Sequence, residues 1–268
     1  MRDQAYELRR LKADYDRMLA KIKSEKPNEF LANIQRPSPF SACILVYPDK
    51  LQGFYPSITE WLPKISQSPQ ELYLWDQGSL VSKYIAEGSE RNDLPFPILE
   101  KQDDLLDLPG KSDVEKLAFL RNINKNLDKH QEIWITIKSS EIQNYRYMID
   151  SADSLCLMVP DHHESAIKCY EIIKQLYGMN CCLPIHLLEF SLNSTTSSSL
   201  TSIKIKNVAK QFLGIDLTPI GVVLSNNKYI PSINEGGEGV KISTASACGD
   251  FMYSFSKNIV YPMSGINQ

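Results

Sequence analysis

The chain of 268 residues lacks the features that mark several specialised classes of protein. It has no run of 18 apolar residues, so a membrane-spanning helix is not expected. None of its six cysteines forms a CxxC pair, which indicates a reduced, cytoplasmic protein without a zinc site. The formal net charge of -3 gives no overall basic field, so nucleic acid is not an expected partner.

Other enzyme signatures are missing too. The chain contains no GxSxG nucleophile motif and no HExxH zinc motif, so it gives no support to a hydrolase of those classes. His162 and His163 are adjacent, but neighbouring residues point in different directions and no third ligand is evident, so we expect no metal there. The charged start, Met1–Gln4, predicts no signal peptide.

The remaining composition is that of an ordinary globular protein, with 43% apolar and 23% charged residues. This length is enough for one sizeable α/β domain. Apolar runs alternate with helix-like patterns from residue 41 onward, which predicts a doubly wound, mostly parallel sheet flanked by helices. The expected strands are Ala42–Tyr47, Glu71–Trp75, Ile133–Ile137, Leu155–Val159, Leu183–Leu188 and Ile220–Leu224. The expected helices are Pro56–Ile65, with Pro63 as a kink or stop, Asp113–Leu127 behind a capping box, His163–Tyr177 and Ile203–Phe212.

An N-terminal extension precedes this domain. Residues 1–26 form a charged segment, with a predicted helix over 3–25 whose apolar stripe is Leu8, Leu11, Tyr15, Met18 and Ile22. Residues 27–40 contain three prolines and read as a linker to the domain at 41–268. The helix is either packed on the domain or a tethered recognition helix, and composition favours neither.

Two segments are rich in polar residues. Ser191–Ser202 has a run of serine and threonine and is expected to be a loop. Asn234–Gly239 is rich in glycine, but its two glutamates and the absence of lysine within the run argue against a phosphate cradle.

Asp3–Arg9, Ser151–Pro160 and Phe212–Val223 are three stretches that together resemble MinD/ParA-type P-loop ATPases, and within them most closely the FlhG (FleN, YlxH) regulators of flagella. Asp3–Arg9 (DQAYELR) is similar to the DQAxxLR motif of FlhG proteins. Ser151–Pro160 and the helix after it resemble the ADxVxVVTTPEPTS segment, and Phe212–Val223 resembles the FLGxxxxxxGxIP segment. The resemblance spans nearly the whole chain and implies a P-loop NTPase-like fold.

The loop that should hold the nucleotide phosphates departs from this pattern. At the place of GKGGVGKS the chain has Pro48–Tyr55, in which Gly53 alone keeps its type. The two lysines of the motif fall on Asp49 and Phe54, and its magnesium-binding hydroxyl falls on Tyr55. Lys50 is a shifted lysine, but one lysine does not rebuild a cradle that depends on glycine backbone and positive charge.

The acids expected around the magnesium ion are reduced to one. Asp76 keeps the first acid of a pattern like LIDAD, and Thr136 replaces the acid that follows the third family strand. The adenine-reading asparagine is also not evident near Leu188–Phe190. Because Mg²⁺ needs hard oxygen ligands and charge compensation, we expect neither a cofactor nor ATP hydrolysis. Phe54, Tyr55 and Trp75 are hypothesised to fill the vacated nucleotide volume.

The resemblance implies a regulatory role. In FlhG proteins the DQAxxLR helix docks on FlhF, a GTPase of the signal-recognition-particle type, so Asp3, Gln4, Ala5, Leu8 and Arg9 are the expected partner-binding residues. A flagellar transcription regulator and a second copy of the chain are further expected partners. The alternative is an active MinD/ParA-like ATPase that uses ATP and Mg²⁺ at a non-standard site and cycles on the membrane. Its membrane helix would be Phe251–Val260, which has one basic residue and fits a helix packed on the sheet better.

Overall fold

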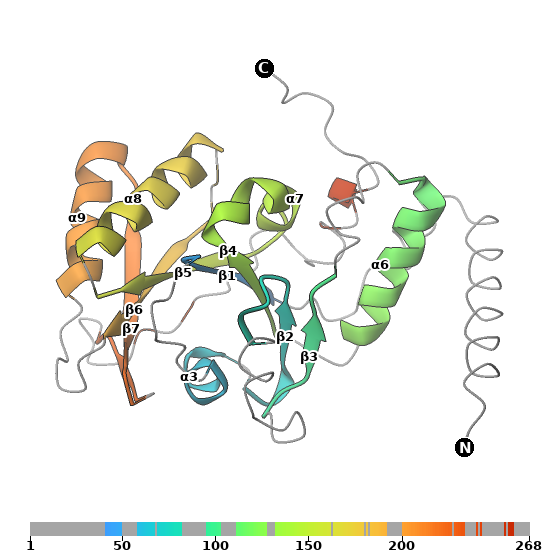
Figure 1. Ribbon diagram of the computed structural model, residues 1–268, viewed down its shortest axis with the longest axis horizontal. Coiled ribbons are helices and arrows are strands. Elements are labelled where there is room, and N and C mark those ends of the chain that lie inside the picture. Colours follow the sequence, from blue (N-terminus) through green and yellow to red (C-terminus); the bar gives the residue numbers. More distant parts are fainter. Residues whose placement is uncertain are drawn as a thin grey trace.

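A single mixed sheet organises the part of the chain that the computed structural model describes (Figure 1). The described residues are 41–49, 58–67, 69–81, 95–102, 111–127, 132–161, 163–179, 181, 183–191, 200–226, 228–233, 240, 242, 255 and 257–259. The sheet has eight strands in the order β3-β2-β4-β1-β5-β6-β7-β8. All neighbouring strands pair in parallel except β7 and β8, which form an antiparallel pair.

Most strands are buried along their whole length, as expected for a parallel sheet covered on both faces. The central strand β1 (Ser41–Tyr47) has six consecutive buried residues, and its neighbours β4 (Glu132–Lys138) and β5 (Ser154–Pro160) show the same pattern. The other strands are β2 (Leu72–Asp76), β3 (Ile98–Glu100), β6 (Ile185–Ser191), β7 (Leu217–Leu224) and β8 (Tyr229–Pro231).

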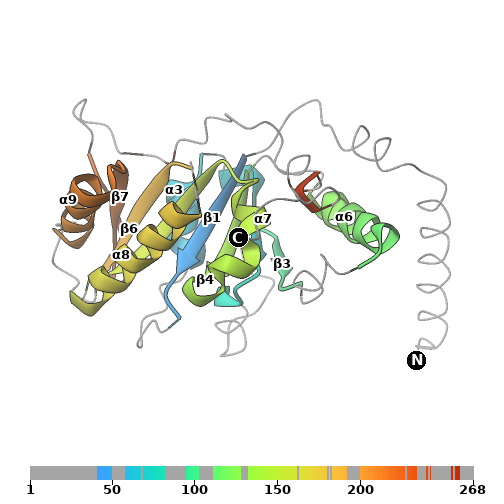
Figure 2. The same cartoon turned by 90° about the horizontal axis from the view of Figure 1, so that it is seen from above.

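The described helices cover the two faces unequally, as Figures 1 and 2 show. One face, the α3 face, packs against α3 (Ile58–Ile65) through Ile58, Trp61, Leu62 and Ile65. The opposite face, the α8 face, packs against α6 (Asp113–Leu127), η4 (Ser139–Tyr145), α7 (Arg146–Ile149), α8 (His163–Gly178) and α9 (Leu200–Leu213). Apolar burial on both faces is the main stabilising term of this architecture.

The predicted fold class is therefore confirmed, and so are the predicted strands and helices between Ser41 and Leu224 that lie within the described residues, to within a few residues at their ends. The capping box of α6 forms as expected: Ser112 Oγ donates to Glu115 Oε2 at 2.6 Å, and the Glu115 amide donates to Ser112 Oγ at 3.4 Å. The hydrogen bond to Ser112 also lowers the pKa of Glu115. Phe255 and Ile259, in the predicted last helix, are buried in the core of the α8 face.

Two expectations need correction. Pro63 does not stop α3, because the helix continues to Ile65 and the Ser66 amide still donates to the Leu62 carbonyl at 3.0 Å. The segment Ser191–Ser202 is not wholly a loop: Ser191 ends β6, and Leu200–Ser202 are the first turn of α9. The short elements β3, η4 and β8 were not predicted, since three-residue strands and 3₁₀ turns leave too little periodicity to detect.

Several predictions lie outside the described residues. They include the helix at 3–25, the linker at 27–40, the loop residues Lys50–Tyr55 and the segment Asn234–Gly239. No described helix is long and apolar enough to cross a membrane.

Candidate functional site

The connections between strands define where a ligand site belongs in this sheet. After β1 the chain crosses to β2 over the α3 face, whereas after β4 and β5 it crosses over the α8 face. The chain therefore leaves the carboxyl end of β1 on the opposite side from its two neighbours. In open α/β sheets a crevice at such a switch point is the usual ligand site.

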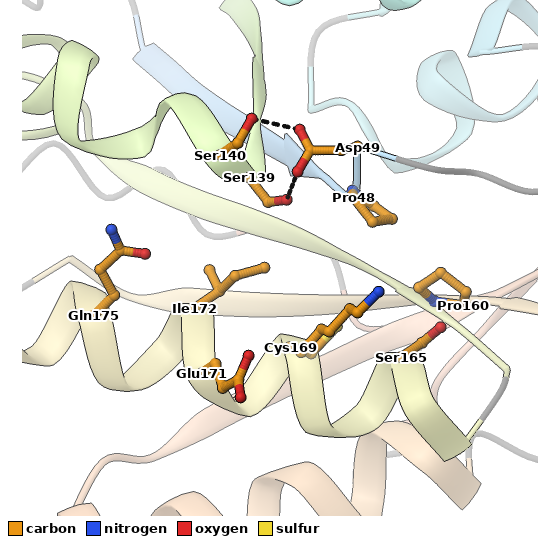
Figure 3. Close-up of a pocket in the computed structure, with 11 residues that line it drawn as sticks. Pro48, Asp49, Ser139, Ser140, Pro160, Ser165, Cys169, Glu171, Ile172 and Gln175 are labelled. Atoms are coloured by element: carbon orange, nitrogen blue, oxygen red, sulfur yellow. Dashed lines mark hydrogen bonds between the residues drawn. The ribbon is translucent and has the colours of Figure 1, made fainter.

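A pocket of about 400 Å³ opens at this switch point (Figure 3). Its walls come from the segment after β1, the start of η4, the end of β5 and one side of α8. The lining residues are Pro48, Asp49, Ser139, Ser140, Pro160, Ser165, Lys168, Cys169, Glu171, Ile172 and Gln175. Burial raises the pKa of the Cys169 thiol to about 12, so this cysteine is a neutral part of the wall.

Asp49 is held at the mouth of the pocket by two serines from the loop after β4. Ser140 Oγ donates to Asp49 Oδ1 at 2.6 Å, and Ser139 Oγ donates to Asp49 Oδ2 at 3.2 Å (Figure 3). The described charges of the lining are thus two carboxylates, Asp49 and Glu171, against one ammonium, Lys168. A carboxylate fixed where a phosphate cradle needs positive charge disfavours an anionic ligand.

Asp76 lies at the end of β2, two strands away from β1, and does not face this pocket. Its side chain is fully buried and accepts hydrogen bonds from at least three groups in the described part of the chain. The donors are the amides of Leu80 and Val81, at 2.8 and 3.0 Å, and the hydroxyl of Thr136, at 2.8 Å. The Asp76 carboxylate therefore accepts hydrogen bonds from the backbone amides at the start of the helical turn after β2, as an N-cap carboxylate does.

Thr136 is covered by the turn that follows β2. The Gly78 amide donates to the Thr136 carbonyl at 2.8 Å and lies 3.1 Å from Thr136 Oγ1. On the other side of this turn, the Tyr47 hydroxyl donates to the Gly78 carbonyl. A β-carbon on Gly78 would lie 2.6 Å from Tyr47 Cε1, so a glycine is needed for this close approach. The turn therefore closes the edge of the sheet between β2 and β1.

The buried side chain of Gln77 holds the same turn in place through hydrogen bonds. Its Oε1 accepts hydrogen bonds from Trp75 Nε1 at 3.1 Å and from the Gln102 amide at 3.0 Å. Its Nε2 donates to the Gln102 carbonyl at 3.2 Å and to the Tyr145 hydroxyl at 3.0 Å. All four hydrogen bonds that a glutamine side chain readily makes are thus formed in a buried place.

These contacts decide how the predicted site residues relate to one another. Asp76 and Thr136 are brought together, while Asp49 lies apart from them with Ser139 and Ser140. Trp75 is not at the pocket; it is buried on the α8 face, where its ring meets Phe255 edge-on at 6.0 Å. Phe54 and Tyr55, like Lys50 and Gly53, lie outside the described residues, as do Asp3, Gln4, Ala5, Leu8 and Arg9.

Mg²⁺ does not fit Asp76 and Thr136 as they are arranged. Both side chains are 0% exposed, and the carboxylate is already occupied by three donors. A magnesium site instead needs several open oxygen ligands and room for water. Within the described ranges no group of three or more histidine, cysteine or acidic residues is placed to hold a metal ion.

Sequence reasoning missed Gln77, Ser139 and Ser140. The two serines follow β4 directly, so their position after a buried strand could have placed them at the carboxyl edge of the sheet. Nothing in the sequence identifies Gln77 as the centre of a buried network, because its partners are 25 and 68 residues away.

No protein-family model matches the chain, and no curated protein sequence matches it. Among solved structures, it is similar to the MinD cell division protein of Aquifex aeolicus, with 12% identity and a TM-score of 0.40 over 82% of this chain and 97% of that one. A plasmid partition protein from Borrelia burgdorferi is 12% identical to this chain, with a TM-score of 0.42 over 70% of this chain and 93% of that one. The signal recognition particle receptor FtsY from Elizabethkingia anophelis in complex with GDP is 12% identical, with a TM-score of 0.41 over 88% of this chain and 70% of that one. Likeness at this level carries no weight for the site, and the fold rests on the sheet order above.

Proposed function

We propose that this protein is an FlhG-like regulator that does not hydrolyse ATP and that acts through protein contacts in the cytoplasm. In this proposal it controls the placement or number of flagella by binding a signal-recognition-type GTPase of the FlhF kind. The N-terminal DQAxxLR helix makes the contact, with Asp3, Gln4, Ala5, Leu8 and Arg9 at the interface.

The observation that supports the absence of hydrolysis is the closed state of Asp76 and Thr136. Both side chains are fully buried, and each is engaged by hydrogen bonds within the turn after β2. ATP hydrolysis in P-loop enzymes depends on Mg²⁺ held next to the phosphates, and its loss removes the main electrostatic stabilisation of the transition state. Asp49 adds a negative charge at the switch point.

The role of the N-terminal helix is supported by the resemblance of Asp3–Arg9 to the FlhG motif. A glutamine amide can orient an attacking water without itself titrating, as the GTPase glutamines do. Gln4 is therefore proposed to act at the nucleotide site of the partner, with Leu8 as an apolar anchor.

Calorimetric titration with ATP and with ADP, each with Mg²⁺, tests the first half of the proposal. The expected result is no heat of binding and no rise in melting temperature at millimolar nucleotide. Micromolar binding would refute this half and favour the alternative, an ATPase with a non-standard site that cycles on the membrane.

GTP hydrolysis by a purified FlhF-type GTPase tests the second half. We expect the full chain to accelerate hydrolysis and the Gln4→Ala variant to leave the GTPase at its basal rate. Gln143→Ala, which changes an exposed glutamine of η4, is the matched control and should stimulate like the unmodified chain. Equal stimulation by both variants would refute the role of Gln4.

A further inference from the structure

One side of α8 forms a polar wall of the pocket at the carboxyl end of β1, called here the switch-point pocket. The polar members of this wall follow one another at steps of three or four residues, so they lie on the same side of the helix: Ser165, Lys168, Glu171 and Gln175. None of the four has a hydrogen bond or an ion pair with another residue in the described part of the chain. Their polar groups are therefore available to a ligand in the pocket.

Across the pocket, a carboxylate is held in one orientation. Ser140 Oγ donates to one oxygen of Asp49, and Ser139 Oγ donates to the other. An ionised carboxylate has about four acceptor positions, so each oxygen of Asp49 keeps one for a ligand. Figure 3 shows Asp49 and the two serines on one side of the pocket, and the labelled residues of α8 on the other. This arrangement suits a planar guanidinium group, which binds a carboxylate through two parallel N–H donors.

The charges of the lining select the charge pattern of a ligand. Two carboxylates, Asp49 and Glu171, line the pocket together with one ammonium, Lys168, so the described lining has a net charge of −1. A ligand with two cationic groups and one anionic group can pair with all three. The volume of about 400 Å³ is in the usual range for a small-molecule site. Apolar contact for a methylene chain comes from Pro48, Pro160 and Ile172.

We propose that the switch-point pocket binds a small basic amino acid with a guanidinium side chain. Asp49 binds the guanidinium group, Glu171 binds the α-ammonium group and Lys168 binds the α-carboxylate. At neutral pH such a ligand carries a net charge of about +1, which balances the charge of the pocket. Its methylene chain lies between the two charged ends, against the apolar part of the wall. The site uses described residues alone and does not depend on the GTPase contact.

Two other classes of ligand fit these residues less well. A phosphate ester would bring negative charge toward Asp49 and Glu171, with Lys168 as the one ammonium of the described lining. A metal ion would need several donors close together, and no group of three or more histidine, cysteine or acidic residues is placed to hold one within the described ranges. An amino acid instead makes use of both signs of charge.

Titration of the full chain with L-arginine, followed by the amide shifts in NMR spectra, tests the proposal. We expect saturable binding with a Kd of about 1 mM or tighter. Asp49→Asn and Glu171→Gln should each weaken binding at least about tenfold, because each leaves a cationic group of the ligand without its partner. Glu164→Gln is the matched control: it removes a carboxylate from an exposed position of α8 outside the pocket, and should change the Kd by less than about twofold. Unchanged amide shifts far from the pocket would show that each variant is folded.

Three ligand analogues assign the charged groups one by one. L-Citrulline, in which a neutral group replaces the guanidinium, should bind the unmodified chain at least about tenfold more weakly than L-arginine does. N-acetyl-L-arginine lacks the α-ammonium group, so Glu171→Gln should not weaken its binding further, whereas Asp49→Asn should. Agmatine lacks the carboxylate, so its binding should be insensitive to Lys168→Gln. A general effect of a substitution on the fold would not follow this pairing of residue and ligand group.

Three outcomes would overturn the proposal. The first is no saturable change at about 20 mM L-arginine, a concentration far above the expected Kd. The second is equal weakening by Glu171→Gln and Glu164→Gln, which would indicate attraction by the overall charge of α8. The third is tighter binding of N-acetyl-L-arginine than of L-arginine, since the occupant would then be the basic carboxyl terminus of a peptide. The nucleotide titration and the GTPase assay use none of these ligands, so failure of this proposal and failure of the proposed function are distinguished.

Discussion

The histidine at position 186 should make the stability of this protein sensitive to acid. His186 lies in β6 between Cys156 of β5 and Thr218 of β7, and only 3% of it is exposed. Neither ring nitrogen has a hydrogen-bond partner among the residues that the structure describes. Burial without a partner disfavours the charged imidazolium and lowers the pKa of His186 from 6.5 to about 4.

The sign and size of the effect follow from the two pKa values. Between pH 6.5 and about pH 4 the unfolded chain binds a proton at this residue and the folded chain does not. The free energy of unfolding therefore falls as the pH is lowered through this window. At about 1.4 kcal/mol for each pKa unit, the full loss attributable to His186 is about 3 kcal/mol.

Two carboxyl groups act in the opposite direction. Burial raises the pKa of Glu189 and of Asp150, so each binds its proton more readily in the folded chain and stabilises it as the pH falls. The pH profile of the unmodified protein contains these three contributions and that of Glu115, whose lowered pKa acts in the same direction as His186. The difference between this profile and that of a His186 variant isolates the histidine.

The assay is urea unfolding at intervals from pH 4 to pH 8, followed by tryptophan fluorescence. Trp61, Trp75 and Trp134 are all fully buried, so the signal should report loss of the core. His186→Leu should remove about 3 kcal/mol of pH dependence and, at pH 7, raise stability by about 1–3 kcal/mol, because two buried unpaired nitrogens are replaced by an apolar group. Substitutions of His130, His162 and His163 by glutamine, one at a time, provide the comparison. Parallel profiles for the unmodified chain and His186→Leu would refute the reasoning.

Three further substitutions probe the backbone and the turn after β2 by the same unfolding assay. Gly214→Ala should cost about 1 kcal/mol of stability, because Gly214 follows the last turn of α9 at φ +68°. Gly178→Ala should not, since an added β-carbon there also has no atom within 4 Å but the backbone angle is not positive. Equal effects of the two substitutions would contradict the backbone argument. Gly78→Ala should cost about 1–3 kcal/mol through the clash with Tyr47, and Tyr47→Leu in the same chain should recover part of it; no cost would show that the ring moves freely. Gln77→Leu should cost about 2–4 kcal/mol of stability, because the groups of Trp75, Gln102 and Tyr145 lose a buried hydrogen-bond partner. Gln143→Leu on the surface should be near neutral. Similar costs for the two substitutions would contradict the role of the Gln77 network.

The parallel strands could be predicted because burial on both faces requires continuous apolar runs. β1 and β5 each consist of seven apolar or small residues in succession, and β4 has five between Glu132 and Lys138; this pattern needs no knowledge of the partner strands. The start of α6 could be predicted for a similar reason, since a capping box is a local interaction over three residues.

The candidate site could be predicted only in part, because its contacts join distant residues. Asp49 and Ser140 are 91 positions apart, and Asp76 and Thr136 are 60 apart. The sequence shows that acid and hydroxyl groups stand at the ends of strands, but it does not show which of them are buried under the turn at Gly78. Trp75 illustrates the same limit: its position at a strand end suggested a role in the pocket, whereas its side chain points into the core toward Phe255.

An aspartate at position 136 tests whether this edge of the sheet lacks only one magnesium ligand or is closed to the ion altogether. Thr136 Oγ1 lies 2.8 Å from Asp76 Oδ1, and both residues are fully buried, so Thr136→Asp would bring two carboxylates together without water. Two such groups cannot both ionise at this distance, and one would hold a proton at neutral pH. We expect a loss of about 3–5 kcal/mol in the free energy of unfolding, because breaking a buried network leaves an uncompensated charge. Adding 10 mM Mg²⁺ in the same urea assay should not change this loss, because the turn at Gly78 leaves no room for a hydrated ion. Thr136→Val keeps the volume but removes the hydroxyl, and should cost less because it adds no second charge. Stabilisation of Thr136→Asp by Mg²⁺, absent in Thr136→Val, would mean that the turn opens to admit the ion, and the closed state of this edge could then no longer explain an absence of hydrolysis.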